Sequence, residues 1–245
     1  MNSLRVTAPD RLSVSQFSED ILVWDYFGRK RHGIFVEVGA NHPKDLSQTW
    51  LLEQNGWEGI LIEPQSACCE RLRQERKSSK VFQVACGSPE QKGAAPFFIS
   101  TESIFSSLQR RVNDAGLRYI GSETVEVLPL DDVLAEAGNP KIDFVSIDVE
   151  GTELDVLRGF SLVKHRPGLL IVEDHLHSLR VHSYISKRGY KLVKRTGCNS
   201  WYIPRGHSFH GSLWERLKLY QKVWLGTPFR RLRLKMKKKK EGPIS

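Results

Sequence analysis

The chain has 245 residues, which is enough for one α/β domain with a sizeable core and too few for two domains of typical size. Its formal net charge of +9 is concentrated near the carboxyl end, where residues 205–245 hold 12 Lys and Arg residues against 2 acids. Residues 1–204 carry 25 bases and 26 acids, so the body of the chain is nearly neutral. This argues against a nucleic-acid-binding core, which would carry its basic residues on the domain surface itself.

The four cysteines, Cys68, Cys69, Cys86 and Cys198, show neither CxxC spacing nor suitably placed histidines. A sulfur-based metal site is therefore not expected, and four reduced thiols indicate a cytoplasmic protein.

The first 20 residues lack the apolar segment of a signal peptide, and no run approaches the ~18 apolar residues of a membrane-spanning helix. We expect three parts, namely an N-terminal extension (1–32), a main domain (33–204) and a basic tail (205–245).

The first predicted strand is the short apolar run GIFVEV at residues 33–38, which is rich in β-branched and aromatic side chains and ends at Gly39. A helix is expected next, because Asp45 and Gln48 have the spacing of a capping box. The run GILIEP at 59–64 predicts the second strand. The next expected elements are a charged helix over 65–77 and a third strand over 81–87 (VFQVACG).

Residues 88–128 interrupt this alternation and predict an insertion or a lid. Two strand-like runs, APFFIS and ETVEVLPL, are separated by the serine-rich stretch STESIFSSL instead of a long helix. Ser103, Ser106 and Ser107 can contact the hydroxyls of a substrate from such a lid. A plain polar loop is an equally good interpretation of the same stretch.

The second half of the main domain returns to alternating strands and helices. Thr152 and Asp155 have capping-box spacing at the start of one of these helices. The predicted elements are a helix in LDDVLAEAG, a fourth strand in KIDFVSIDVEG, the helix after Thr152, a fifth strand over 168–175, a helix near 177–188 and an antiparallel hairpin over 190–203. This alternation predicts a doubly wound α/β domain with a parallel sheet, in which ligands bind beyond the carboxyl ends of the strands.

Polar or small residues follow all five predicted strands, and together they predict a ligand site at one edge of the sheet. They are Glu37, Gly39 and Asn41 after the first strand, Glu63 after the second, Cys86 and Gly87 after the third, Asp148 and Glu150 after the fourth, and Glu173, Asp174 and His175 after the fifth. Glu63 can accept hydrogen bonds from both hydroxyls of a ribose, which is the role of the acid that ends the second strand in dinucleotide-binding folds.

The loop after the first strand distinguishes between nucleotide ligands. It has one glycine where a pyrophosphate-binding turn has three, so NAD is not expected. Glu37 beside this loop would repel a diphosphate and would suit a cationic ligand. S-Adenosylmethionine combines a ribose and an adenine with an ammonium and a sulfonium and has no phosphate, so it fits this pattern.

The motifs FVEVGAN, LIEP, ACG, IDFVSIDVEGTELDVLRGF and LLIVEDH together resemble the FkbM-type methyltransferases over residues 33–203. The resemblance implies S-adenosylmethionine as cofactor and the class I (Rossmann-like) methyltransferase fold, a seven-stranded sheet whose last hairpin is antiparallel. It also implies the roles of the cofactor-binding residues. Glu37, Gly39, Ala40 and Asn41 are expected at the methionine end, Glu63 at the ribose, and Cys86 with Ala85 near the adenine.

One departure from the family pattern concerns the acceptor. Many members have a second glycine after GAN, where this chain has His42 and Pro43. Among the members with a proline-bearing loop are rhizobial enzymes that methylate a sugar hydroxyl of lipochitooligosaccharide nodulation factors. We therefore expect a glycan or lipid-linked glycan acceptor, while the resemblance indicates the donor more firmly than the acceptor.

The candidate catalytic residues are His175, Asp148 and Glu150. Asp148 and Glu150 lie two residues apart, as do Glu173 and His175 on the next strand, so each pair shares one side of an extended segment. His175 has the pKa range of a general base at neutral pH, or it is a histidine that bonds a neighbouring loop. Asp148 can instead bind the methionine ammonium while Glu150 caps a helix. A further alternative is that Asp148, Glu150 and Asp174 bind Mg²⁺, although no metal is our leading expectation.

Two further features bear on possible partners. Trp201 and Tyr202 offer aromatic faces for sugar stacking, although strand alternation predicts that one of them belongs to the core. The tail combines apolar residues at helical spacing with the basic run RRLRLKMKKKK. Such a segment can lie on the anionic inner surface of a membrane, or it can be a docked helix with a disordered solubilising end. No nucleic-acid partner is expected.

Overall fold

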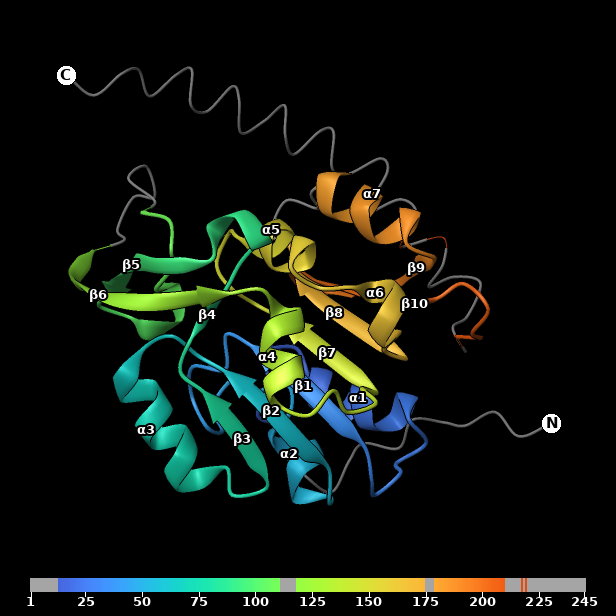
Figure 1. Cartoon of the computed structure of the whole chain (residues 1–245). Coiled ribbons are helices and arrows are strands. Elements are labelled where there is room, and N and C mark those ends of the chain that lie inside the picture. Colours follow the sequence, from blue (N-terminus) through green and yellow to red (C-terminus); the bar gives the residue numbers. More distant parts are fainter. Residues whose placement is uncertain (1–12, 111–117, 175–178, 210–216, 218, 220–245) are drawn as a thin grey trace, which may run out of the picture.

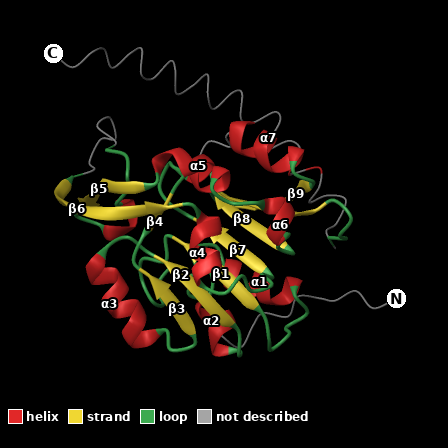
Figure 2. Cartoon of the chain, in the orientation of Figure 1, coloured by secondary structure: helices red, strands yellow, loops and turns green. Residues whose placement is uncertain are grey.

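The computed structural model describes residues 13–110, 118–174, 179–209, 217 and 219. Their main feature is a seven-stranded sheet with helices on both faces, drawn with the sequence colours in Figure 1 and by element type in Figure 2. The strand order is β3-β2-β1-β7-β8-β10-β9. The strands of this sheet are β1 (Ile34–Val38), β2 (Glu58–Ile62), β3 (Ser79–Phe82), β7 (Phe144–Ile147), β8 (Leu169–Glu173), β9 (Tyr190–Thr196) and β10 (Asn199–Pro204).

The register brings the carboxyl ends of the parallel strands together. Val38 of β1 pairs with Ile62 of β2 on one side and with Ile147 of β7 on the other, and Ile147 pairs with Val172 of β8. Strand β10 runs antiparallel to both β8 and β9. The predicted doubly wound sheet with an antiparallel last hairpin is therefore confirmed.

Strand alternation divides the core into two layers. Val36 and Val38 of β1 pack with α4 (Leu130–Glu136), α5 (Glu153–Arg158) and α7 (Leu179–Lys187) on one face. Phe35 packs with α1 (Glu19–Tyr26), α2 (Trp50–Gln54) and α3 (Ser66–Glu75) on the other. Because helices cover both faces, the strands are apolar at nearly every position, as their sequences indicated.

The predicted third strand, 81–87, is wrong as a single element. Its first part belongs to β3 in the main sheet, and its second part is β4 (Ala85–Cys86), which pairs in a separate sheet of order β4-β6-β5. Strand β4 pairs with β6 (Tyr119–Leu128), and β6 pairs in turn with β5 (Gly93–Ser100). Both strands come from the segment 88–128, so the two strands predicted there are confirmed. An apolar run carries no sign that it changes sheets, so the sequence did not reveal this break. The small sheet lies beyond the carboxyl ends of β1 and β7 (Figure 1).

Helix α2 begins at Trp50, so the capping box predicted from Asp45 and Gln48 is wrong. The N–H of Trp50, the first helical residue, donates instead to the hydroxyl of Ser47 (3.1 Å). The buried carboxylate of Glu37 accepts hydrogen bonds from the backbone N–H of Gln48 (3.2 Å) and from the hydroxyl of Thr49 (2.6 Å). The capping box predicted for α5 is also wrong, because its N-cap residue has no side-chain cap bond, although the helix itself is confirmed.

Four short elements were not predicted. They are α1 in the N-terminal extension, α6 (Leu162–His165), and the 3₁₀ turns η1 (Pro89–Gln91) and η2 (Ser103–Phe105). Helix α1 was missed because it buries two acids, Glu19 and Asp20, in its first turn, which hides its amphipathic pattern.

Within the described residues, no helix is long and apolar enough to cross a membrane.

Candidate active site

A cavity lies at the carboxyl ends of β1, β2, β7 and β8 and is bounded on its far side by the small sheet and by η2. It is lined by all the residues predicted to bind the cofactor and by several that were not predicted. The predicted lining residues are Glu37, Gly39, Ala40, Asn41, Glu63, Cys86, Asp148, Glu150 and Glu173; the lining also includes Gln16, Phe97, Ile104 and Asn199, which carried no motif in the sequence.

The loop Gly39–Asn41 forms the inner wall of this cavity. The N–H groups of Gly39 and Ala40 both donate to the carbonyl oxygen of Ile62, at 2.9 and 3.2 Å. Gly39 has a φ of +86°, and a Cβ at this position would lie 1.8 Å from the carbonyl oxygen of Asp148. Only glycine fits here, so the single glycine of the motif is explained by the close approach of two strand ends.

Glu37 lies in the cavity wall and also connects β1 to the residues before α2 and to Arg76. Besides Gln48 and Thr49, which precede α2, its carboxylate has Arg76 as a neighbour, with an N···O distance of 3.9 Å. Burial raises the pKa of Glu37, while Arg76 and the hydrogen bonds from Thr49 and Gln48 act in the opposite direction. Its expected place at the methionine end of the cofactor stays a prediction.

Glu63 follows the end of β2 with its side chain in the cavity wall. Its two oxygens accept hydrogen bonds from the N–H groups of Asn41 (3.0 Å) and Gln65 (2.8 Å). Burial raises its pKa to about 7, and Glu123 adds to the increase. A carboxylate has about four lone-pair positions, so after these two bonds it can still accept from the hydroxyls of a ribose.

The serine-rich stretch closes over two of the strand-end loops. Ser103 donates to the side-chain oxygen of Asn41 (2.8 Å), and Ser107 donates to the carbonyl oxygen of Glu150 (3.2 Å). Ser103 and Ser106 line the cavity, whereas Ser107 is buried and serves as a tether. This stretch therefore belongs to the site wall, and its contact with substrate hydroxyls stays a prediction.

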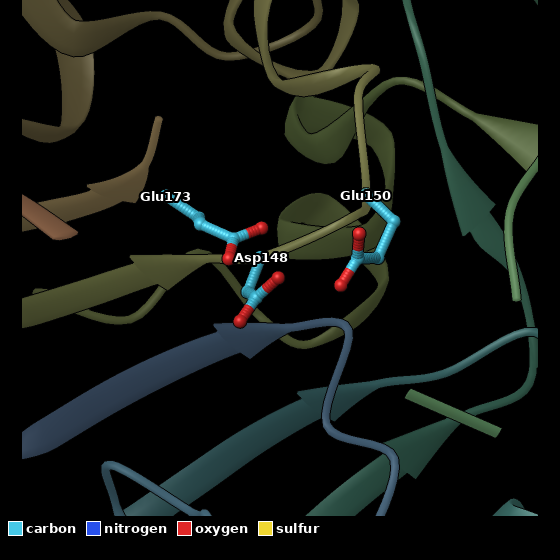
Figure 3. A group of neighbouring side chains, drawn as sticks. All are labelled: Asp148, Glu150 and Glu173. Carbon is cyan, nitrogen blue, oxygen red and sulfur yellow. The ribbon is translucent and has the colours of Figure 1, made fainter. Parts of the chain in front are cut away.

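Three carboxylates meet at the ends of β7 and β8, as Figure 3 shows. One oxygen each of Asp148, Glu150 and Glu173 lies within 4.8 Å of the others. Glu150 has a φ of +57°, a conformation that is uncommon for a residue with a long side chain, and Gly151 follows with a φ of +114°. This turn places Glu150 on the same side of the site as Asp148.

The neighbouring carboxylates of this group raise the proton affinity of Asp148. The pKa of Asp148 lies well above its usual value, chiefly because the side chain is desolvated and then because of the charge of Glu173, with a smaller effect from Glu150. The grouping of Asp148 and Glu150 with Asp174 is corrected, since the third member of the group is Glu173. Strand alternation turns the side chain that follows Glu173 toward the other face of the sheet.

Several other predictions concern the rim of the site. Cys86 lines the cavity, and burial raises the pKa of its thiol to about 12, so it is a neutral wall residue. The prediction that only one of Trp201 and Tyr202 belongs to the core is wrong, because both are buried. Both faces of β10 are covered, so neither ring is available to stack on a sugar.

His175 lies outside the described residues, so its predicted role as a general base stays a prediction.

The strand order and the cavity at the carboxyl ends of the strands define a class I S-adenosylmethionine-dependent methyltransferase. Residues 37–192 match the family model described as the methyltransferase FkbM domain, which covers more than half of the chain. The chain belongs to the FkbM methyltransferase family. Its methyl donor is S-adenosylmethionine, in agreement with the sequence prediction.

A comparison with solved structures found similar chains at low sequence identity. The methyltransferase domain of METTL16 is 14% identical over 81% of this chain and 71% of that chain, with a TM-score of 0.45. Precorrin-6y C5,15-methyltransferase from Geobacter metallireducens GS-15 is 12% identical over 80% and 91% of the two chains, with a TM-score of 0.41. TrmK from M. capricolum, solved with S-adenosyl-homocysteine, is 10% identical over 75% and 67%, with a TM-score of 0.38. A comparison with curated protein sequences found no match.

Proposed function

We propose that this methyltransferase transfers a methyl group to a hydroxyl of a carbohydrate. The observation that carries the proposal is one continuous cavity that joins the loop Gly39–Asn41 and Glu63 to the group formed by Asp148, Glu150 and Glu173. The first set suits the donor, and the second offers oxygen acceptors for the hydrogen-bonding groups of a polar acceptor. Acid-lined sites of this kind fit a neutral polyol better than an anionic substrate.

The residues of the chain fit the donor in three ways. Glu63 has acceptor capacity left for the ribose hydroxyls, the Gly39 loop lines the same cavity, and the buried Cys86 presents an apolar wall where the adenine is expected. When bound, S-adenosylmethionine supplies a methyl group on a positively charged sulfur, and the electrons of the broken carbon–sulfur bond stay on that sulfur. Negative charge shared among the carboxylates of Asp148, Glu150 and Glu173 favours this cation and its ammonium.

The chain's own contribution to the reaction is alignment and proton transfer. The acceptor hydroxyl must lie in line with the methyl group, with water excluded by the wall formed by Ser103 and Ile104. The proton that the hydroxyl loses passes to a general base. We assign this role to His175, with Asp148 and Glu150 orienting the hydroxyl from the opposite strand end.

The acceptor that we favour is a fucose 2-hydroxyl of a lipochitooligosaccharide nodulation factor, and it rests on the proline-bearing loop with His42 and Pro43. Another glycan, a polyketide or a peptide is the alternative acceptor. Incubation with isotope-labelled donor and a panel of extracted glycans tests this, since the product gains the ~14 daltons of a methylene that methyl transfer adds. Methylation of peptides or polyketides with no labelled glycan would overturn the carbohydrate assignment.

We further propose that the enzyme is cytoplasmic and contacts the inner membrane surface through its tail, residues 205–245. Most of this segment lies outside the described residues, and the proposal rests on its apolar residues at helical spacing and its 12 basic residues. A membrane-bound enzyme would meet lipid-linked acceptors at that surface. A scaffold without catalysis would use the same tail, but it would not need the donor-binding wall described above.

A further inference from the structure

The three carboxylates at the ends of β7 and β8 are arranged as a set of ligands. Their oxygens lie within 4.8 Å of one another and come from two neighbouring strand ends (Figure 3). Glu150 and Glu173 are 8% and 6% exposed, while Asp148 is half-buried and faces the cavity. A cation that reaches the cavity can therefore reach all three.

The charges in this group favour a positive ligand. Asp148 has the carboxylate oxygens of Glu150 and Glu173 within 4.8 Å of its own, so three acidic groups share one end of the cavity. Carboxylates this close can share a proton, or they can be bridged by a metal ion that interacts with all of them at once. The second arrangement uses one oxygen from each of the three side chains.

An independent observation comes from the neighbouring strand. Asn199 of β10 pairs directly with Glu173 of β8, so the two side chains lie on the same face of the sheet. The amide nitrogen of Asn199 donates to Glu19 (2.9 Å), but its amide oxygen is buried without a hydrogen-bond partner. Asn199 is 3% exposed and lines the same cavity as the three carboxylates. A buried amide oxygen without a donor is costly, and a metal ion or its bound water would satisfy it.

We infer that Asp148, Glu150 and Glu173 bind a divalent cation of the Mg²⁺ class, with the amide oxygen of Asn199 as a further donor to the ion or to its bound water. Oxygen ligands on opposite sides of Mg²⁺ are about 4.2 Å apart and those of Ca²⁺ about 4.8 Å, twice the metal–oxygen distance. The three carboxylate oxygens are at most 4.8 Å apart. One such ion can therefore contact all three after rotation of the side chains. An all-oxygen ligand set favours these cations over zinc or copper.

The role of the ion in catalysis rests on the proposed function. The ion would lie in the same cavity as the Gly39 loop, where it can hold an acceptor hydroxyl against the methyl group and increase its acidity. Two adjacent sugar hydroxyls can bind one ion together, so the site would favour acceptors with vicinal hydroxyls. Cation binding itself does not require the acceptor.

Binding of Mn²⁺ as a probe to the purified full-length protein tests the inference, because electron paramagnetic resonance counts the free ion directly. We expect one Mn²⁺ per chain, displaced by excess Mg²⁺. Glu150→Gln and Glu173→Gln should each weaken binding by about tenfold or more, the loss expected for one charged ligand. As a matched control, Glu153→Gln removes a nearby charge that is outside the group and should change affinity by less than about threefold.

Three results would overturn the inference. They are the absence of a stoichiometric Mn²⁺ site, unchanged affinity in both ligand variants, and an equal loss in the control, which would indicate diffuse attraction. Thermal unfolding of each variant checks folding, and S-adenosylhomocysteine binding by calorimetry separates this inference from the proposed function. Cofactor binding without Mn²⁺ binding would reject the ion alone, and Mn²⁺ binding without cofactor binding would reject the methyltransferase site alone.

Discussion

The carbonyl oxygen of Asp148 occupies the space where a side chain on Gly39 would begin, 1.8 Å from the point that a Cβ atom would take. This contact joins the loop after β1, where we propose that the donor binds, to the carboxylate group after β7. The N–H of Asp148 also donates to the carbonyl oxygen of Val38 (2.9 Å), so the two strand ends are held together. Any change that separates them should affect donor and acceptor sites at once.

Gly39→Ala should therefore lower stability and abolish cofactor binding. The added methyl group overlaps a backbone atom, and alanine at a φ of +86° is strained, so we expect a loss of about 3 kcal/mol or more in the free energy of unfolding. Urea denaturation and calorimetry with S-adenosylhomocysteine measure the two effects. Gly28→Ala is the control, since Gly28 has a φ of +64° but open space around it, and it should lose only about 1 kcal/mol. Equal losses at both positions would contradict the contact.

Glu63 should give the enzyme a pH dependence that Glu63→Gln lacks. Its pKa rises from 4.5 to about 7 on folding, so the folded protein holds a proton that the unfolded chain releases. Stability should be highest below pH 4.5 for this group and should fall between pH 4.5 and 7, by about 3 kcal/mol in total. Denaturation at a series of pH values measures this slope, and a slope that is the same in Glu63→Gln would exclude Glu63 as its source.

Cofactor binding should show the opposite pH trend through the same residue. The ionised carboxylate is the better acceptor for ribose hydroxyls, so affinity for S-adenosylhomocysteine should rise as the pH passes about 7. Glu63→Ala should weaken binding by about 1 to 3 kcal/mol, the range for a lost hydrogen bond to a charged group. Unchanged affinity in calorimetry would remove Glu63 from the ribose site.

His175→Ala should lower turnover by about 10² to 10⁴, the usual contribution of a general base, with little change in cofactor affinity. Wild-type activity should rise through neutral pH as the imidazole loses its proton, and the variant should lack this rise. Steady-state rates over pH 5.5 to 8.5 test it, with His207→Ala on the exposed surface as the control. A variant with near-normal turnover and the same pH profile would leave alignment or a carboxylate as the source of rate.

Deletion of residues 230–245 should reduce binding to anionic vesicles and leave turnover of a water-dispersed acceptor unchanged. The deleted segment includes the run RRLRLKMKKKK, and each basic residue near a membrane surface contributes about 1 kcal/mol. Vesicle sedimentation at low and high salt measures the effect. Deletion of only 241–245 keeps the basic run and is the matched control. Equal sedimentation of all three proteins would contradict membrane binding.

Much of the fold could be predicted because its strands are buried on both faces. Runs such as FVEV and FVSI are apolar at most positions, and polar residues follow where the strands end. The alternation with helices then gives the sheet and its ligand-binding edge. The clustering of Glu63, Asp148 and Glu150 at that edge follows from the same topology.

Contacts between segments that are distant in sequence could not be predicted. Glu37 accepts a hydrogen bond from the hydroxyl of Thr49, which lies 12 residues later in the chain, and no local pattern predicts this contact. The same holds for Asn199, whose place beside Glu173 depends on the pairing of β10 with β8. The N-terminal segment reaches the site because Ser15 pairs with Leu46, which brings Gln16 into the cavity wall. Each of these features is a tertiary contact that a sequence pattern does not encode.

A crystal structure with S-adenosylhomocysteine bound is the most direct test of the central claim, that the cavity between the Gly39 loop and the carboxylate group is the site of methyl transfer. We predict that both ribose hydroxyls lie within hydrogen-bonding distance of Glu63 and that the sulfur atom faces the side of the cavity lined by Asp148 and Glu150. Binding of the ligand elsewhere, or with its sulfur directed away from these carboxylates, would contradict the account.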